Sequence, residues 1–158
     1  MNKVVITGLG IVSPIGNTVQ EYWNSLKEGR CGVDYITRFN TEEMVVKIAA
    51  EVKNLEKELY LSRSDIKCSD LFAQYGVSAA MQAFWDSGLE QHTDEQRLGV
   101  YFGSGIGGIS SLETGIETYQ KESARAISPY YIPKIIINSA AGLIAIKCRA
   151  KGSCLSVV

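Results

Sequence analysis

Runs of apolar residues predict three buried β-strands in this chain. The runs lack the strict alternation of apolar and polar positions that a half-exposed strand shows, so both faces of each strand should be covered. The predicted strands are Val4–Thr7, Leu98–Phe102 and Cys154–Val158. A shorter stretch, Val45–Ala49, is a candidate for a fourth strand.

Apolar residues at helical spacing predict four helices. The first opens at Thr18, which has capping-box spacing to Glu21, and Gly29 is placed to end it. Its apolar positions follow one stripe at i, i+3, i+4 and i+7, and they are Val19, Tyr22, Trp23 and Leu26. The other predicted helices are Ser69–Ser87, Ser110–Gln120 and a helix that begins near Pro133 and continues through Ala145.

The helix that begins near Pro133 should be buried, because apolar residues surround it on nearly every side. Proline suits a first helical turn, where its missing backbone N–H does no harm. Gly76 lies inside the helix over 69–87 and costs it about 1 kcal/mol relative to alanine. A glycine at this position would permit close packing of a neighbouring element.

Strands that alternate with helices indicate an α/β fold with a largely parallel sheet. The 158 residues suit about one domain, and a hydrophobic share of 46% is enough for a core. Because 16 Lys and Arg residues stand against 17 Asp and Glu residues, nucleic acid is not expected as a partner. No apolar run approaches the ~20 residues of a membrane-spanning helix, so a membrane is not expected either.

The first apolar run superficially resembles a secretory signal, but Pro14, Gly16 and Asn17 follow it without a small-x-small cleavage pattern, so a buried strand is the better interpretation. The four cysteines lack C-x-x-C spacing and should be free thiols in a cytoplasmic protein. They are Cys31, Cys68, Cys148 and Cys154. The single histidine, His92, should be a solvated loop residue, so neither a metal nor another cofactor is expected.

A glycine-rich segment after the second strand has the spacing of a dinucleotide-binding fingerprint, Gly103-x-Gly105-x-x-Gly108. That fingerprint needs a second strand that ends in an acidic residue about 20 residues further on, and residues 121–133 form no strand pattern. A nucleotide-binding α/β domain is therefore the weaker interpretation. The stronger one is a sharp strand-to-helix turn from which Ile106 projects as the only bulky side chain.

Catalytic motifs are missing from the sequence pattern. There is no nucleophile elbow, metal-binding cluster or phosphate-binding lysine loop. Cys154 lies on an apolar strand with no histidine near it in sequence, so it is expected to be a core residue rather than a nucleophile. Residue chemistry alone thus predicts an α/β domain with a glycine turn and no evident catalytic group.

Five segments, taken together, are more specific than any single motif. They are Val4–Gly16, Ile36–Phe39, Gly103–Gly108, Ile127–Pro133, and Ala150–Gly152 leading to Leu155–Val158. In this order and spacing they resemble the β-ketoacyl synthase family over essentially the whole chain. The resemblance is to the type that elongates acyl chains in dissociated fatty acid synthesis, and a related polyketide-type synthase is also compatible.

The resemblance implies a thiolase-like fold with helices layered around a mostly parallel sheet, of which residues 1–158 would be the partial N-terminal half. It implies a homodimer and a decarboxylative Claisen condensation of an acyl thioester with malonyl-acyl carrier protein. In the family, a cysteine thiolate carries the acyl group and two histidines assist. That cysteine would lie just beyond Val158, so no catalytic residue is assigned and this chain by itself is expected to be inactive.

Binding roles, in contrast, match residues that are present. Ile106 and Tyr131 match positions at the acyl pocket of the family. Lys67 matches a basic position that docks the acidic acyl carrier protein, and Arg63 is a looser match. The last strand matches the one that pairs with its twin across the dimer axis, and its residues are Cys154, Leu155, Ser156, Val157 and Val158.

An alternative function is a non-catalytic module that uses this last strand to pair with a full-length synthase, because an exposed strand edge is a template for pairing. In either case, half of a thiolase-like domain should expose large apolar patches around residues 135–158. The residues Cys68, Ser69, Cys148, Arg149 and Ser153 depart from common family patterns, so the substrate range stays open.

Overall fold

The computed structural model describes residues 3–91 and 94–158, so His92 and its expected loop position lie outside the described residues. The α-helices are α1 (Val19–Lys27), α2 (Arg63–Cys68), α3 (Leu71–Asp86), α4 (Ile109–Lys121), α5 (Tyr131–Ile135) and α6 (Asn138–Cys148). The strands are β1 (Val33–Tyr35), β2 (Ile48–Ala50), β3 (Val100–Gly103) and β4 (Cys154–Val157). Short 3-10 turns are η1 (Lys57–Leu59), η2 (Leu89–Gln91), η3 (Glu95–Arg97) and η4 (Ala124–Ala126).

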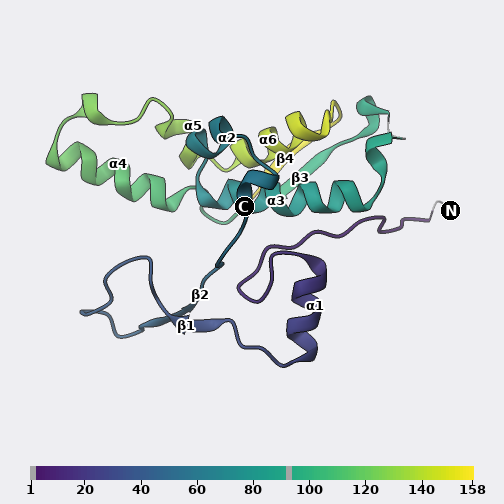
Figure 1. Ribbon diagram of the computed structural model, residues 1–158. Helices are drawn as coiled ribbons and strands as arrows, with labels where there is room; N and C mark the ends of the chain where they lie inside the picture. Colours follow the sequence, from purple (N-terminus) through teal and green to yellow (C-terminus); the bar gives the residue numbers. More distant parts are fainter. Residues whose placement is uncertain (1–2, 92–93) are drawn as a thin grey trace.

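The body of the molecule is a pair of long helices next to a parallel strand pair (Figure 1). Helices α3 and α6 pack on each other, and α6 also contacts both β3 and β4. The two strands run parallel, with Val100 opposite Cys154 and Gly103 opposite Val157. The second and third predicted strands are thereby confirmed, and so is the parallel character of this sheet.

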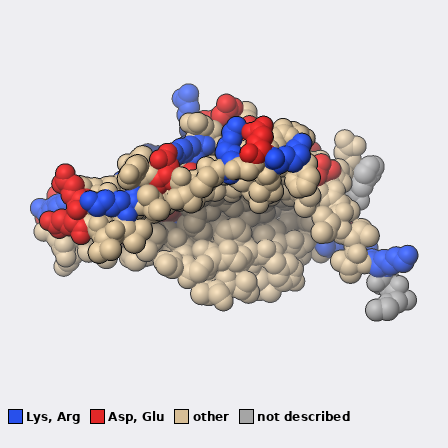
Figure 2. Space-filling model, turned by 90° about the horizontal axis from the view of Figure 1, so that it is seen from below, with Lys and Arg blue, Asp and Glu red and all other residues tan. Residues whose placement is uncertain are grey.

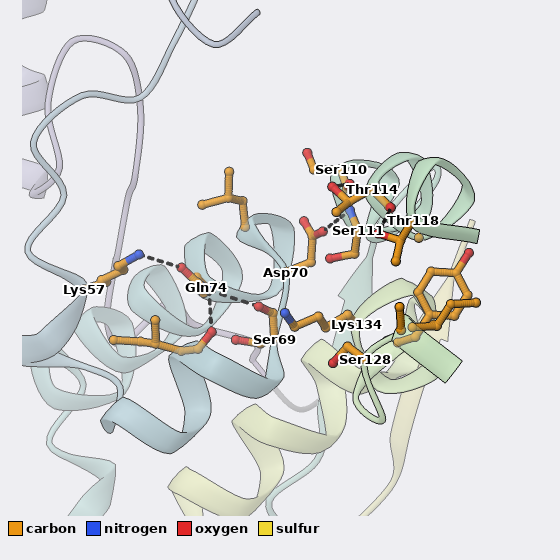
Figure 3. Close-up of a pocket in the computed structure, with 16 residues that line it drawn as sticks. Lys57, Ser69, Asp70, Gln74, Ser110, Ser111, Thr114, Thr118, Ser128 and Lys134 are labelled. Atoms are coloured by element: carbon orange, nitrogen blue, oxygen red, sulfur yellow. Dashed lines mark hydrogen bonds between the residues drawn. The ribbon is translucent and has the colours of Figure 1, made fainter. Parts of the chain in front are cut away.

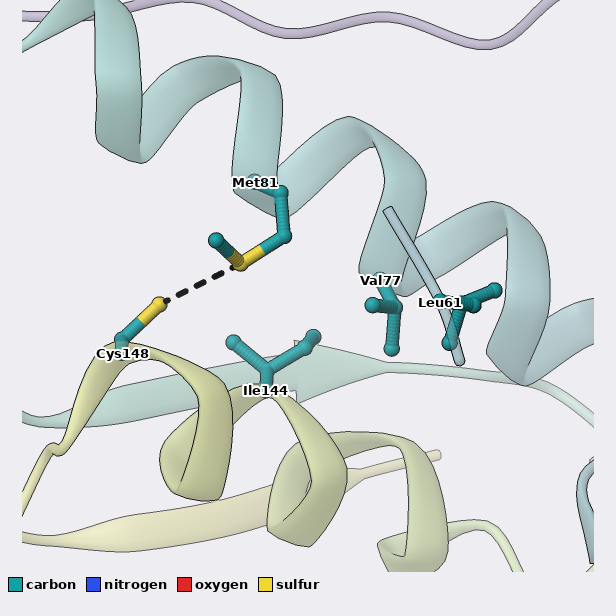
Figure 4. Close-up of a cluster of buried hydrophobic side chains, with 5 residues drawn as sticks. All are labelled: Leu61, Val77, Met81, Ile144 and Cys148. Carbon is teal, nitrogen blue, oxygen red and sulfur yellow. Dashed lines mark hydrogen bonds between the residues drawn. The ribbon is translucent and has the colours of Figure 1, made fainter. Parts of the chain in front are cut away.

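The core lies where α3 faces α6. Its buried members are Leu61, Val77, Met81, Ile144 and Cys148 (Figure 4). Val77 and Ile144 approach each other from opposite helices, with 0% and 6% of their surfaces exposed (Figure 4). Because burial of a side chain of this size contributes about 1.5–3 kcal/mol, contacts between these helices dominate the stability of the body.

The long helix α3 lies within its predicted range. It ends at Asp86 with Ser87 as its C-cap, and Gly88 follows with a left-handed φ of +66°, the conformation that favours glycine after a helix. Gly76 has the packing role that its position suggested, because a Cβ atom there would collide with the ring of Phe102 on β3. This close contact between helix and strand offsets the helix cost of about 1 kcal/mol.

The single helix predicted from Pro133 to Ala145 is wrong, because the segment forms two helices. Between α5 and α6, Ile136 has extended backbone angles of φ −75° and ψ 136°. The break leaves the Ile135 carbonyl free to accept a hydrogen bond of 3.2 Å from the Gly108 N–H. Burial is also one-sided, since Ala140 is fully buried whereas Ile146 is 76% exposed.

The first predicted strand, Val4–Thr7, is also wrong, because this segment has no strand conformation and pairs with no described strand. A strand needs a neighbour to satisfy its backbone groups. The segment after it instead runs along α3 and is held by polar side chains. The Leu9 N–H donates to the Asp86 carboxylate at 2.9 Å. The Gln82 side-chain amide accepts a hydrogen bond from the Ile11 N–H and donates one to the Ile11 carbonyl.

Helix α1 begins as predicted but buries little. The Thr18 hydroxyl accepts from the Glu21 N–H at 3.2 Å, and the Glu21 carboxylate accepts from the Asn17 N–H at 2.8 Å. The second bond goes to the residue before the cap, so the capping box is incomplete. On its apolar stripe, Trp23 is 56% and Leu26 is 46% exposed.

A small antiparallel hairpin of β1 and β2 follows α1 and pairs Val33 with Ala50. The strand predicted at Val45–Ala49 is thus shifted toward the C-terminus. The hairpin is tied by an ion pair of 2.8 Å between Lys53 and Asp34.

Many large apolar side chains remain exposed, above all in the N-terminal third of the chain. Seen from below, Lys, Arg, Asp and Glu gather along one margin, whereas the hollowed middle of this face is formed by uncharged residues (Figure 2). Within the described ranges, no helix is long and apolar enough to cross a membrane.

Candidate functional site

A recess of about 470 Å³ opens where the junction between α2 and α3 meets α4 and α5 (Figure 3). Most of its labelled side chains are polar. Those from the α2–α3 junction and α3 are Ser69, Asp70 and Gln74, and those from α4 are Ser110, Ser111, Thr114 and Thr118 (Figure 3). Ser128, Tyr131 and Lys134 come from the segment that contains α5.

Two buried polar side chains organise this recess. Gln74, which is 4% exposed, donates to the Ile66 and Ser69 carbonyls at 3.2 and 3.1 Å. Asp70, which is 7% exposed, accepts from the Ser111 N–H on α4 at 2.8 Å. Because buried polar groups are costly without partners, these bonds fix the end of α2, the start of α3 and the start of α4 relative to one another.

The glycine segment Gly103–Gly108 forms the predicted turn between β3 and α4. Gly107 has a left-handed φ of +82°, and its N–H donates to the Ser104 hydroxyl at 3.1 Å. A Cβ atom at Gly107 or Gly108 would collide with backbone carbonyls of α5. The chain's own backbone thus uses the close approach that these glycines permit, which favours the turn interpretation over a nucleotide site.

The two residues assigned to an acyl pocket lie in different settings. Ile106 projects from the glycine turn and is 67% exposed. Tyr131 lines the recess, and its ring lies so close to α4 that a Cβ atom at Gly115 would collide with it. Ile106 is not among the residues that line the recess, so the structure does not bring this pair together there.

The two basic residues assigned to carrier docking lie one turn apart on α2, and both Arg63 and Lys67 are exposed. A complete capping box between Ser62 and Asp65 starts this helix. The Lys67 ammonium lies 6.0 Å from the centre of the Tyr130 ring. The short helix therefore has a fixed start and presents two positive charges to solvent.

An ion pair attaches α2 to the body. The Lys147 ammonium on α6 lies 2.9 Å from the Asp65 carboxylate. Burial by itself would raise the pKa of Asp65, but the bonds from Lys147 and Ser62 outweigh it and hold that pKa below its ordinary value. The carboxylate thus remains ionised and holds α2 in place.

Strand β4 has an exposed, largely apolar surface. Leu155, Val157 and Val158 are 53%, 61% and 91% exposed, which confirms the expected apolar patch near the end of the described chain. Cys154 is exposed as well, so its assignment as a core residue is wrong. The reason is that β4 has β3 as its only partner among the described strands. The Ser156 hydroxyl is buried without a hydrogen-bond partner in the described structure.

The cysteines differ widely in access. Cys148 is buried, and its Sγ lies 3.9 Å from Met81 Sδ. Burial raises the pKa of the Cys148 thiol, which keeps it protonated and unreactive. Cys31 is exposed and Cys68 is partly exposed. Among the residues with a described placement, no three His, Cys, Asp or Glu side chains form a metal-binding group.

Sequence reasoning missed the polar residues of the recess, in particular Asp70 and Gln74. An acidic residue before an apolar helix usually indicates a cap of that helix, and Asp70 occupies this position. Its side chain nevertheless makes no capping bond to α3 and reaches α4 instead. The sequence therefore indicated a helix cap at Asp70, but for α3 rather than for α4.

Comparisons with known proteins agree with this architecture. The profile described as "Beta-ketoacyl synthase, N-terminal domain" matches residues 1–158. The "3-oxoacyl-[acyl-carrier-protein] synthase 2" of Coxiella burnetii (strain RSA 493 / Nine Mile phase I) is 44% identical over 157 residues, which cover 99% of this chain and 38% of that protein. The chain thus spans about two fifths of the length of the curated relatives that it matches.

Two solved structures show the same fold. The ishigamide ketosynthase/chain length factor superposes with a TM-score of 0.88 at 29% identity, over 98% of this chain and 39% of that chain. The AntDE:AntF structure, a type II PKS acyl-carrier protein in complex with its ketosynthase bound to the hexaketide, gives a TM-score of 0.76 at 20% identity, over 97% and 40%. The predicted thiolase-like α/β fold is therefore confirmed.

Proposed function

This chain belongs to the β-ketoacyl synthase family, and from that premise we propose that it supplies the carrier-docking and acyl-binding side of a fatty acid condensing enzyme. One observation carries the proposal: 99% of the chain aligns at 44% identity with a 3-oxoacyl-acyl carrier protein synthase. We treat residues 1–158 as one domain and place the protein in the cytoplasm, where free cysteines such as these persist.

The proposed reaction is a decarboxylative Claisen condensation. Malonyl-carrier loses carbon dioxide, and the resulting carbanion forms a carbon–carbon bond with the carbonyl carbon of an acyl thioester. The thioester carbon–sulfur bond breaks and releases the thiolate, which leaves a 3-oxoacyl-carrier. No residue of the 158 matches the cysteine or the histidines that perform these steps in the family, so this chain alone should not turn over.

An assay of the purified chain with malonyl-acyl carrier protein and an acyl donor tests this part of the proposal. We expect carbon dioxide release and 3-oxoacyl product to stay at the background rate without protein. Measurable condensation would contradict the division of roles, because it would require a nucleophile within the chain that we have not assigned.

Docking of the acidic carrier is proposed for the exposed face of α2. Two observations support it: Arg63 and Lys67 lie one turn apart on a helix that is fixed at its start, and the Lys147–Asp65 ion pair holds that helix on the body. Charged residues at such a surface act mainly on encounter and specificity.

The docking proposal is tested by titrating the chain with acyl carrier protein at low salt. We expect Lys67→Glu to weaken binding about 10-fold, because a repulsive charge replaces an attractive one. The matched control is Lys27→Glu at the end of α1, which makes the same change of charge on an exposed helix elsewhere. Equal losses in both variants would show that only net charge matters and would overturn the assignment of α2.

Acyl binding is proposed for the region around the glycine turn and the recess. Ile106 offers an exposed apolar side chain, and Tyr131 lines the recess with its ring against Gly115 of α4. The supporting physical feature is the glycine turn itself, which fixes Ile106 at the junction of a strand and a helix.

A second candidate function is pairing with another synthase chain through β4, and the exposed surface of that strand favours it. Leu155, Val157 and Val158 present exposed apolar side chains, and among the described strands β4 pairs only with β3. The open edge of such a strand is a pairing template. Co-purification with a full-length synthase, lost on Val157→Lys, would support this role. A chain that stays monomeric and retains no synthase would refute it.

A further inference from the structure

The carboxylate of Asp70 caps a helix to which it does not belong. Helix α4 follows the glycine turn, so its N-cap position is Gly108, which has no side chain to accept a hydrogen bond from the first turn. Asp70 Oδ2 accepts from the Ser111 N–H at 2.8 Å, across 41 positions of sequence. A negative charge at a helix N-terminus is favourable because the free N–H groups there carry partial positive charge.

The same helix start is held from a second direction by α5. The Gly108 N–H donates to the Ile135 carbonyl at 3.2 Å, and both Gly107 and Gly108 lie against carbonyls of α5. The turn that presents Ile106 is therefore attached to α5 through Gly108, and the first turn of α4 just after it is attached to Asp70 through Ser111. Of these two bonds, only the one to Asp70 involves a charged side chain.

Asp70 also belongs to the segment that holds the end of α2. The Gln74 amide donates to the Ile66 and Ser69 carbonyls at 3.2 and 3.1 Å, and the Ser69 hydroxyl donates to the Asp65 carbonyl at 2.6 Å. All four residues lie within five positions of Asp70, and these bonds connect the start of α3 and the residues before it to α2. A single buried segment thus touches both the helix proposed for docking and the first turn of α4, which directly follows the turn proposed for acyl binding.

We propose that Asp70 is a positioning residue, which sets the place of the Ile106 turn relative to the docking helix α2. The proposal rests on the acyl-binding and docking roles stated above for its functional meaning. Its structural content is independent of them: without the Asp70 carboxylate, the start of α4 and the glycine turn should lose their fixed position while the rest of the chain stays folded.

Amide hydrogen exchange followed by NMR tests the structural content. In Asp70→Ala, we expect exchange of the Ser111 amide and the turn amides to quicken about 10- to 100-fold, because a hydrogen bond to a charged group is lost. Asp70→Asn keeps an acceptor oxygen and should restore most of the protection. The matched control is Asp86→Ala, which removes a carboxylate from the other end of α3 that accepts the Leu9 N–H at 2.9 Å.

The control variant should leave the turn amides unchanged and quicken exchange only near Leu9. If Asp70→Ala and Asp86→Ala quicken the turn amides equally, or if Asp70→Ala leaves the Ser111 amide protected, the positioning role is refuted. Exchange throughout α6 serves as the fold check, because a general loss of stability would raise it in parallel.

A second readout tests the functional meaning. We expect dodecanoyl-pantetheine to shift the methyl resonances of Ile106 in the unaltered chain. In Asp70→Ala, the affinity obtained from the same shifts should be at least about 10-fold lower. If the unaltered chain shows no Ile106 response, the proposed acyl-binding role fails while the exchange experiment still decides the positioning role. If both chains respond with equal affinity, Asp70 does not position the turn for acyl binding.

Discussion

The N-terminal region, residues 3–54, and the remaining body use apolar residues in opposite ways. In the body, Val77 and Ala140 are completely buried between α3 and α6. In the N-terminal region, Val4 and Val45 are 97% and 100% exposed. Both regions contain helices and strands, so secondary structure alone does not show where the stability of the chain resides.

The N-terminal region is attached by polar bonds rather than by a core. Gln82 and Asp86 on α3 hold the backbone near Leu9 and Ile11, and the Arg38 guanidinium donates to the Tyr75 hydroxyl on α3 at 2.5 Å. Such bonds contribute about 0.5–1.5 kcal/mol each when neutral, less than a buried aliphatic side chain. The N-terminal region is therefore held in place by the body and adds little to the stability of the body.

The largest difference between the two regions should appear when an isoleucine is replaced by alanine in each of them. Ile144→Ala should lower the free energy of unfolding by about 2–5 kcal/mol, because it opens a cavity between α3 and α6. Ile6→Ala, at a position that is 83% exposed, should change it by less than about 0.5 kcal/mol. Urea unfolding measures both, and Ile146→Ala, at 76% exposure, controls for helix propensity in α6. Comparable losses of stability at Ile6 and Ile144 would contradict the difference in burial between the two regions.

The next largest difference between the two regions should be in the rates at which their cysteine thiols are labelled. Cys31 lies in the N-terminal region and is exposed, whereas Cys148 is buried with a raised pKa. We expect Cys148 to react at least about 100-fold more slowly than Cys31 in the native chain, since only an exposed thiolate attacks. The rates should converge in denaturant. Fast native labelling of Cys148 would mean that the α3–α6 core opens readily.

Loss of Gln82 should affect the attachment of the N-terminal region specifically. Gln82→Ala removes bonds to the Ile11 and Asn17 backbones and should weaken the attachment of the N-terminal region to α3 by about 1–2 kcal/mol, without lowering the stability of the body. The Ile11 amide should then exchange faster, whereas amides in α6 should not. The control is Gln20→Ala, whose side chain bonds only the exposed Asn24 side chain. Equal effects of both variants would remove the special role of Gln82.

The smallest effect concerns pH and the ion pair that holds α2. Because the pKa of Asp65 is lower in the folded chain than its ordinary value of 3.8, its ion pair stabilises the fold above that value and is lost as pH falls through the folded-state pKa. Lys147→Met should therefore cost about 0.5–1 kcal/mol near neutral pH and nothing in strong acid. Lys121→Met removes a more exposed pair with Glu117 and should cost less. A pH-independent difference would exclude the ion pair as the cause.

Local sequence signals predicted those elements whose causes lie in neighbouring residues. The bounds of α3 follow from its apolar spacing and from Gly88, and the start of α1 follows from Thr18. The glycine turn was likewise predictable, because left-handed backbone at Gly107 needs only the turn itself. The exposed position of Lys67 also agrees with a surface role.

Features that depend on distant partners were not predictable in this way. Val4–Thr7 has the composition of a buried strand, but no described strand lies beside it. The break at Ile136 depends on contacts between α5 and the glycine turn. Asp70 has the sequence position of a local cap, and only the fold shows that it serves α4. In each case the deciding atom belongs to a segment far away in sequence.

The parallel pairing of β3 with β4 also governs when the chain can fold. The strands meet only after α4, α5 and α6 have been laid down between them, as the register of Val100 with Cys154 shows. Closing so long a loop costs entropy before any pairing repays it, and contacts that are distant in sequence slow folding. During synthesis the edge of β3 therefore stays unpaired and prone to aggregation until β4 has left the ribosome.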